Sequence, residues 1–120
     1  MDMKKTLFCL AVVCLAFLSC EREKSYKYTV ETTSGSIFSI NLKEYDEFDN
    51  VLFTRLIYFD KENHSQQFSS MMEAVSIGIP PQSKKIGGNN IDIGNDERYK
   101  LRMDGKLKLT ISSSGTIRAN

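Results

Sequence analysis

The residues of this chain that could do chemistry are few, and its cysteines are the most informative. All three, Cys9, Cys14 and Cys20, lie in the first twenty residues of the 120-residue chain. A thiolate is the nucleophile that forms disulfides, binds metals or takes up an alkyl group. Small exported domains often depend on disulfides, but residues 21–120 contain no cysteine. We therefore expect the rest of the chain to be stabilised by packing alone.

The segment around these cysteines has the pattern of an export signal. Lys4 and Lys5 precede an unbroken apolar run from Leu7 to Leu18. A membrane-spanning helix needs about 20 apolar residues, so this run is too short to span a bilayer. A basic start, a short apolar run and a small residue before a polar sequence are typical of a secretory signal. The alternative is a buried N-terminal helix of a cytosolic protein.

The end of the apolar run reads Phe17-Leu18-Ser19-Cys20. This stretch resembles the lipobox of bacterial lipoproteins, roughly Leu-Ala/Ser-Gly/Ala-Cys, which ends a type II signal peptide. Ser19 and Cys20 fit the pattern, whereas Phe17 and Leu18 depart from its strict form. The resemblance implies cleavage before Cys20 and acylation of its thiol with diacylglycerol and a further chain of the palmitate type. Cys14 fits less well because apolar residues follow it.

The resemblance divides the chain into a signal peptide (1–19), a lipidated cysteine with a short tether (20–25) and a domain (26–120). One acyl chain binds a membrane only marginally, but two or three on one residue make a stable anchor. Residues 21–25 span at most about 17 Å when extended, so the domain would lie close to the bilayer. In this family an Asp after the cysteine often signals inner-membrane retention. Glu21 stands there instead, which favours the outer membrane, on either its periplasmic or its surface side.

The charge of the expected mature protein is balanced. The chain has 16 basic and 15 acidic side chains; removing Lys4, Lys5 and Asp2 with the signal leaves 14 of each. Nucleic-acid binding by bulk attraction is therefore not expected. Charge-driven binding would need a local patch.

The mature chain has a dominant period of two, which is typical of half-buried strands. Turn-forming residues separate the runs, and no stretch has a convincing helical period. The apolar run Val51–Phe59 has apolar residues on both faces and predicts a central strand. The other predicted strands are carried by alternating apolar residues: Tyr26, Tyr28 and Val30; Phe38, Ile40 and Leu42; Val75, Ile77 and Ile79; Ile91 and Ile93; Tyr99, Leu101 and Met103; Leu107, Leu109 and Ile111.

About seven short strands in a domain of this size predict a single all-β fold, a small antiparallel β-sandwich. Strand number and length resemble the immunoglobulin-like fold, although the domain has neither a cysteine pair nor a tryptophan.

The Asp104-Gly105 turn allows a sharper prediction. A three-residue loop, Met103-Asp104-Gly105 with a left-handed Gly105, would pair Leu101 with Leu107 and keep one face of the hairpin apolar. The opposite face would then carry a basic patch for an anionic partner, such as lipid head groups, an acidic glycan or an acidic protein. The alternative is a solvated face that discourages edge pairing. The patch comprises Arg98, Lys100, Arg102, Lys106 and Lys108.

Two other features are candidate sites. Glu44, Asp46, Glu47 and Asp49 crowd one loop beside Asn50, and clustered carboxylates can hold calcium. Their spacing does not match the EF-hand pattern, so acidic turn residues without a metal are the first interpretation. The single histidine, His64, lies in a polar turn and is expected to be exposed. No P-loop, Gly-x-Ser-x-Gly or His-Glu-x-x-His motif is present, and no cofactor is expected.

The sequence thus predicts a lipid-anchored, non-catalytic envelope protein that binds another envelope protein or a ligand. The alternatives are a small glycan-binding lipoprotein and an enzyme or enzyme inhibitor. A glycan binder should expose coplanar aromatic rings, and an enzyme should have a cleft with converging polar groups. An interaction module should expose an apolar patch or an open edge strand.

Overall fold

The computed structural model describes residues 25–120, which form strands and connecting loops with no helix. This part of the chain therefore has no helix that could cross a membrane. The ten strands are β1 (Lys27–Thr32), β2 (Phe38–Tyr45), β3 (Val51–Phe59), β4 (Ser65–Ser69), β5 (Ser76–Gly78), β6 (Gln82–Ile86), β7 (Asn89–Ile93), β8 (Tyr99–Lys100), β9 (Leu107–Ile111) and β10 (Ile117–Ala119).

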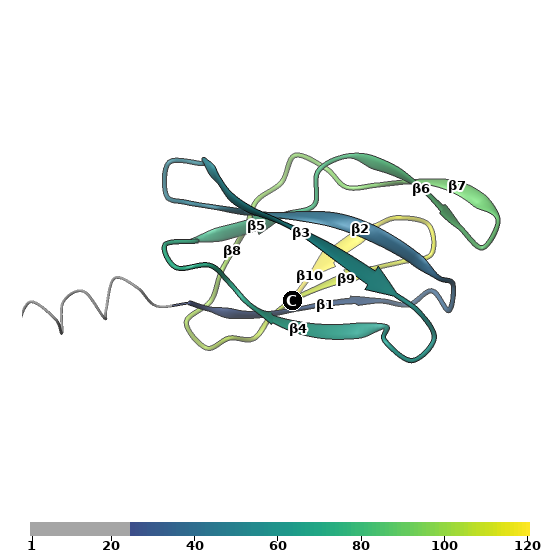
Figure 1. Cartoon of the computed structure of the whole chain (residues 1–120), viewed down its shortest axis with the longest axis horizontal. Coiled ribbons are helices and arrows are strands. Elements are labelled where there is room, and N and C mark those ends of the chain that lie inside the picture. The colour runs from purple at the N-terminus through teal and green to yellow at the C-terminus, as the bar shows by residue number, and fades with distance from the viewer. Residues whose placement is uncertain (1–24) are drawn as a thin grey trace, which may run out of the picture.

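Two four-stranded sheets form the layers of a sandwich (Figure 1). We call them sheet A, with strand order β10-β9-β1-β4, and sheet B, with order β3-β2-β5-β8. The hairpin β6–β7 forms a separate two-stranded ribbon that extends beyond sheet B in Figure 1. The Gln82 side chain in β6 ties this ribbon to β2, since it accepts a bond from the Asn41 amide (2.9 Å) and donates to the Asn41 carbonyl (3.0 Å).

The core follows the period of two seen in the sequence. Successive side chains of a strand point to opposite faces, so one residue in two enters the space between the sheets. A single buried cluster joins both sheets and the ribbon. Its fully buried members include Tyr28, Val30, Leu109 and Ile111 from sheet A, and Ile40, Leu42 and Ile77 from sheet B. The all-β sandwich prediction is confirmed at this level.

Two general features of the fold differ from the prediction. There are ten strands in the described part of the chain, not about seven, because the polar strands β4 and β6 and the short strand β10 have no apolar alternation that predicts them. The sheets are not wholly antiparallel, since β1 and β9 pair in parallel. A parallel pair needs a long crossover, and here the chain between them builds all of sheet B.

The strand Val51–Phe59 is an edge strand, not a central one. β3 pairs with β2 along its length, and no described strand pairs with its other side. An apolar run on both faces can indicate burial on both faces, but it does not specify a second neighbour. The second apolar face of β3 remains exposed.

The predicted pairing of Leu101 with Leu107 is also wrong. β8 pairs with β5 in sheet B, whereas β9 pairs with β1 and β10 in sheet A. The local turn is as expected: the Gly105 amide donates to the Arg102 carbonyl (3.0 Å), and Gly105 has a left-handed φ of 69°. The turn therefore leads the chain from one sheet to the other. Both leucines are buried, because each faces the core from its own sheet.

Candidate interaction surface

The predicted lipidation site lies outside the described residues. Cys20, the signal segment 1–19 and the tether up to residue 24 are all in that part of the chain. Their assignments stay predictions.

The five residues of the predicted basic patch are divided between the sheets. Lys100 belongs to β8 in sheet B and Lys108 to β9 in sheet A. Arg98, Arg102 and Lys106 lie in the flanking loops. The structure does not place them on one face of one hairpin, because that hairpin does not form.

Three of these cations are already paired with carboxylates: Arg98 with Asp49 at 2.9 Å, Arg102 with Asp104 at 2.6 Å, and Lys108 with Glu31 at 3.0 Å. Partial burial alone would raise the pKa of Glu31, but hydrogen bonds from Lys108 and Thr110 lower it below its usual value. Such exposed pairs contribute little stability, yet they reduce the positive charge that is open to an anionic partner.

The calcium candidates do not converge. Glu44 is fully buried and points into the core. The Asp46 carboxylate caps its own turn, accepting the backbone N–H groups of Asn50 and Phe48, both at 2.9 Å. These bonds, the Asn50 bond first, lower the pKa of Asp46. Within residues 25–120 no three Asp, Glu, His or Cys side chains lie close enough together to hold a metal.

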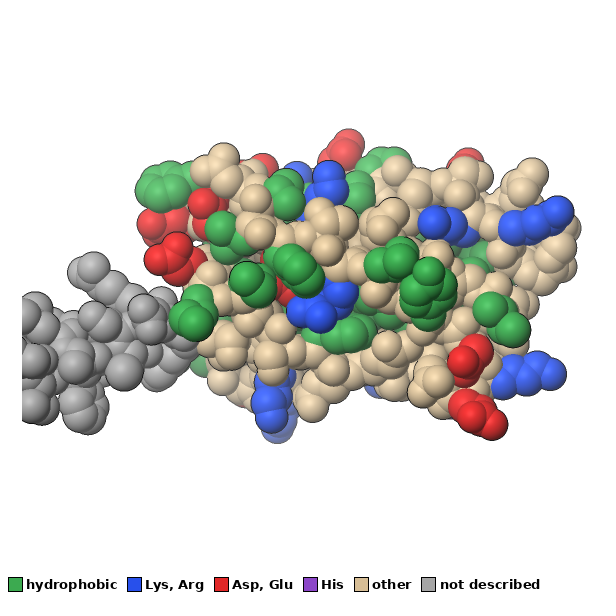
Figure 2. Space-filling model, viewed as in Figure 1, with side chains coloured by type: hydrophobic (Ala, Val, Ile, Leu, Met, Phe, Trp, Pro, Cys, Tyr) green, Lys and Arg blue, Asp and Glu red, His purple; other side chains and the backbone are tan. Residues whose placement is uncertain are grey.

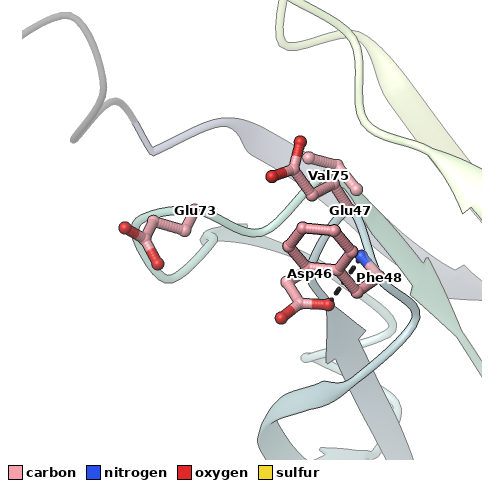
Figure 3. Close-up of a pocket in the computed structure, with 5 residues that line it drawn as sticks. All are labelled: Asp46, Glu47, Phe48, Glu73 and Val75. Atoms are coloured by element: carbon pink, nitrogen blue, oxygen red, sulfur yellow. Dashed lines mark hydrogen bonds between the residues drawn. The ribbon is translucent and has the colours of Figure 1, made fainter.

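An open hollow of about 540 Å³ lies between the β2–β3 and β4–β5 loops. It is lined by Asp46, Glu47, Phe48, Glu73 and Val75, drawn in Figure 3. The three carboxylates point in different directions in this view. A catalytic cleft or cation site needs polar groups aimed at one point, and this hollow does not supply such a point.

His64 lies in the β3–β4 loop and is exposed, as the sequence predicts. Its Nδ1 is 3.3 Å from the Lys61 carbonyl oxygen. His64 and the described residues around it do not form a catalytic triad.

A buried polar cluster crosses the core, and the sequence reasoning missed it. The Tyr28 hydroxyl donates to Glu44 Oε2 (2.6 Å), and Arg55 approaches the same oxygen at 3.3 Å. Arg55 Nε also donates to the Tyr28 hydroxyl (3.1 Å), and the Met71 amide donates to Glu44 Oε1 (2.7 Å). The cluster joins β1, β2, β3 and the loop after β4. Burial, followed by the bond to Glu44, raises the pKa of Tyr28 far above its usual value.

The Arg55 side chain closes the open side of the sandwich between β3 and β4. Its guanidinium lies 5.1 Å from the ring centre of Phe53 and 4.6 Å from that of Phe68. Cation–π contacts of this kind stabilise partly buried arginines. A sequence signal existed: Glu44 is in phase with Ile40 and Leu42, so the alternation directs it inward.

The opposite face of β3 is apolar and exposed. Leu56 and Tyr58 point away from the core with 50% and 65% of their surfaces exposed. They neighbour Asn41 and Ser39 of β2 in the pairing register. Figure 2 shows hydrophobic side chains following the diagonal course of β3 across this side of the molecule. We call Thr54, Leu56 and Tyr58, with their backbone, the β3 edge.

The backbone of the β3 edge points outward. The carbonyl of Tyr58 accepts a bond from the Gln66 side chain, so it faces away from β2. The N–H and C=O groups of Asn41 are hydrogen-bonded to the Gln82 side chain. Asn41 lies opposite Leu56, so β2 does not bond β3 with its backbone groups at this position. Because backbone groups alternate along a strand, the N–H and C=O of Thr54 and Leu56 are directed to the open side.

The β3 edge also lacks the usual protection against pairing. Edge strands are commonly blocked by lysine, proline or inward-pointing charges. β3 contains no lysine and no proline. Its one charged side chain, Arg55, points inward but is already paired with Glu44, so it presents no uncompensated charge to a partner strand. The other strands at the ends of the two four-stranded sheets are shorter and more polar: β4 reads SQQFS, β8 reads YK and β10 reads IRA.

Comparisons with known proteins do not assign a family. No family model matches the chain, and no curated protein matches it. Among solved structures, a disulfide-locked mutant of intermedilysin with human CD59 is similar at 10% identity, with a TM-score of 0.43. Listeriolysin O is similar at 10% identity, with a TM-score of 0.36. Each match covers 82% of this chain but only 24% and 22% of the other chains. Likenesses this distant carry no argument about function.

Proposed function

We propose that this protein is a lipid-anchored, non-catalytic envelope protein that binds another protein chain through the β3 edge. The observation that carries the proposal is a nine-residue edge strand on which Leu56 and Tyr58 are exposed and the backbone groups of Thr54 and Leu56 face the open side. A partner strand could extend sheet B by bonding these groups, while Leu56 and Tyr58 pack against its side chains. Tyrosine is among the residues that most often dominate binding energy at protein interfaces.

The anchoring part of the proposal is supported by the segment from Leu7 to Cys20. A single acylated cysteine leaves no free thiol in an oxidising compartment, and residues 21–120 need none for stability. Glu21 supports the outer membrane as the location. Fractionation of cells labelled with fatty acid checks the anchor and the location. The mature protein should carry the acyl label in the outer-membrane fraction, and the Cys20→Ser variant should not carry it.

The other candidate functions have less support. The aromatic pairs among the described residues, Tyr28–Phe68 and Phe38–Phe59, are tilted by 40° and 39° and involve buried rings. A glycan platform needs coplanar exposed rings instead. Binding of an anionic partner by Lys100 and its neighbours has lost the single-face geometry on which it was predicted. A catalytic role would need the converging groups that the hollow at Phe48 does not offer.

An immunoglobulin-like relationship remains a proposal within the sandwich class. Two facing sheets and a single core support it. The strand order departs from that fold, since β2 and β3 pair in one sheet, whereas the second and third immunoglobulin strands lie in different sheets. An experimental structure that reproduces the direct β2–β3 pairing would exclude the immunoglobulin strand order.

Site-specific photocrosslinking tests the binding surface. A photoreactive amino acid is placed at Leu56 in the full-length protein in its native envelope, with the same amino acid at Arg118 as the control. Both positions lie on edge strands, but Arg118 is on β10 of sheet A. We expect an adduct at Leu56 that is absent at Arg118. Its mass distinguishes a second copy of this chain from a different envelope protein.

A second variant shows whether the adduct depends on strand pairing. Thr54→Pro removes one open N–H group without touching the core. A loss of about 1.4 kcal/mol of binding free energy weakens binding tenfold, and we expect the adduct at Leu56 to decrease by at least this factor. Equal adducts at Leu56 and Arg118, or an adduct insensitive to Thr54→Pro, would refute the β3 edge as the binding surface.

A further inference from the structure

The loops at one end of the sandwich carry apolar side chains at their tips. β1 runs away from this end, β2, β4 and β8 run toward it, and three loops therefore turn there: residues 46–50, 70–75 and 101–106. Figure 1 shows these loops gathered at the end where the chain enters β1. We call this the entry end.

The loops contact one another and the start of β1. The Ser70 amide donates to the Tyr26 carbonyl (2.8 Å), and the Tyr26 amide donates to Ser70 Oγ (2.9 Å). The amide of Val75 donates to the Tyr45 carbonyl (2.8 Å), and that of Leu101 to the Val75 carbonyl (2.9 Å). The entry end is thus one surface and not three independent loops.

The tip of each loop carries a large exposed hydrophobic side chain, and the loop 70–75 exposes Met71 and Val75 as well. Phe48 is 77% exposed, Met72 56% and Met103 85%. Single exposed hydrophobic residues are ordinary on protein surfaces. Three at the tips of loops on one end of the domain can contact the same apolar surface at once.

The opposite end is different. Its loops, 60–64 between β3 and β4 and 112–116 between β9 and β10, read DKENH and SSSGT. The loop between β1 and β2 also lies at this end, and its Ile37 is 77% exposed, as Phe48 is at the entry end. Exposed apolar side chains are therefore concentrated at one end of the domain, and that end is the one joined to the tether.

Charges at the entry end do not select an anionic partner. Asp49 and Asp104 are paired with Arg98 and Arg102, and the Asp46 carboxylate caps its own turn. The remaining exposed acids, Glu47 and Glu73, are balanced by bases such as Lys27 and Lys106. An apolar contact with a neutral surface fits this distribution better than electrostatic binding.

We propose that Phe48, Met72 and Met103 rest in the head-group region of a lipid bilayer, so that the sandwich stands on its entry end above the membrane. This inference rests on the proposed lipid anchor at Cys20. Residues 21–25 span at most about 17 Å, which keeps the entry end near the bilayer that holds the acyl chains. Each apolar tip then needs only a weak interaction of its own, because the tether supplies a high local concentration of lipid. The β3 edge runs from the entry end toward the opposite end and is left accessible.

Fluorescence measures this contact directly, because the chain contains no tryptophan. Phe48→Trp and Met103→Trp each introduce one reporter at a tip, and Ile37→Trp is the matched control, since Phe48 and Ile37 are equally exposed. Each full-length, lipidated variant is reconstituted into vesicles of phosphatidylcholine, with and without brominated acyl chains. A side chain about 5–10 Å below the surface should be quenched by bromine placed near the head group.

We expect blue-shifted emission and strong bromine quenching for Phe48→Trp and Met103→Trp, unchanged in high salt. Ile37→Trp should keep the emission of an exposed indole and be quenched by aqueous iodide instead. Flotation of the same vesicles distinguishes a failure of the lipid anchor from a failure of the membrane contact. Protein that does not float lacks the anchor, which overturns both. Protein that floats while all three reporters behave alike overturns the membrane contact and leaves the anchor standing.

Discussion

Two regions of this protein reverse the usual distribution of side chains. The core cluster of Tyr28, Glu44 and Arg55 places charged groups inside, whereas the β3 edge and the entry end place large hydrophobic groups outside. The buried charges have partners within the chain: Glu44 accepts bonds from three different residues. The exposed hydrophobic groups have none among the described residues. The comparison indicates that the first region stabilises the fold, and the second is the surface that we propose to bind a partner.

The largest expected effect comes from breaking the core cluster. Glu44→Ala would leave Arg55 without its counter-ion and the Met71 amide without its acceptor. Removing one partner of a buried ion pair costs about 3–5 kcal/mol. Urea unfolding of the variant should show a loss of this size. The control is Glu62→Ala at an exposed loop position, where a change within about 0.5 kcal/mol is expected. Equal losses for the two variants would contradict a stabilising role of the cluster.

A smaller effect should appear at alkaline pH. The pKa of Tyr28 is raised in the folded state by burial and by Glu44, so the folded protein holds the phenol proton more tightly than the unfolded chain. Stability is then fully present below the unfolded pKa of about 10 and falls as pH rises above it, by up to about 1.4 kcal/mol per pH unit.

Unfolding free energies measured between pH 9 and about pH 11.5 test this dependence, since the unfolded pKa of tyrosine is about 10. Tyr28→Phe should flatten the alkaline decline, although it lowers stability at neutral pH by removing the bond to Glu44. Tyr58→Phe, on the exposed face of β3, serves as the control and should leave the decline in place. A decline that persists in Tyr28→Phe would assign it to another group.

The smallest effect on stability is expected at the β3 edge. Leu56→Ala should change the free energy of unfolding by no more than about 0.5 kcal/mol, because the side chain is half exposed. Leu42→Ala removes the same atoms from the core and should cost about 2–5 kcal/mol. A large loss for Leu56→Ala would mean that this face stabilises the domain itself, which would weaken the case for a partner.

Particular residues show how far the sequence could predict this structure. The alternation of Tyr28 with Val30 and of Ile40 with Leu42 was enough to assign strands and their buried faces. The left-handed turn at Gly105 was also predictable, because a turn depends on a few adjacent residues. The same turn was wrongly taken as evidence that its flanking strands pair. Turn geometry permits a hairpin, but competition among all strands decides which pairs form.

The candidate sites were less predictable than the fold. The basic residues from Arg98 to Lys108 alternate in sequence and yet divide between two sheets. Glu44 was assigned to an acidic loop although its phase directs it into the core. Phe48, Met72 and Met103 lie far apart in the chain, and no local pattern relates them. Each of these outcomes depends on contacts between distant segments.

The order of neighbouring residues was enough to predict the all-β class, the inward and outward phases of the main strands and the resemblance of residues 1–20 to a lipoprotein signal. Only the assembled fold places β3 at an edge, brings Glu44 to Tyr28 and Arg55, and gathers three apolar loop tips at one end. A strand's period is local, whereas its neighbours are selected by the packing of the whole chain.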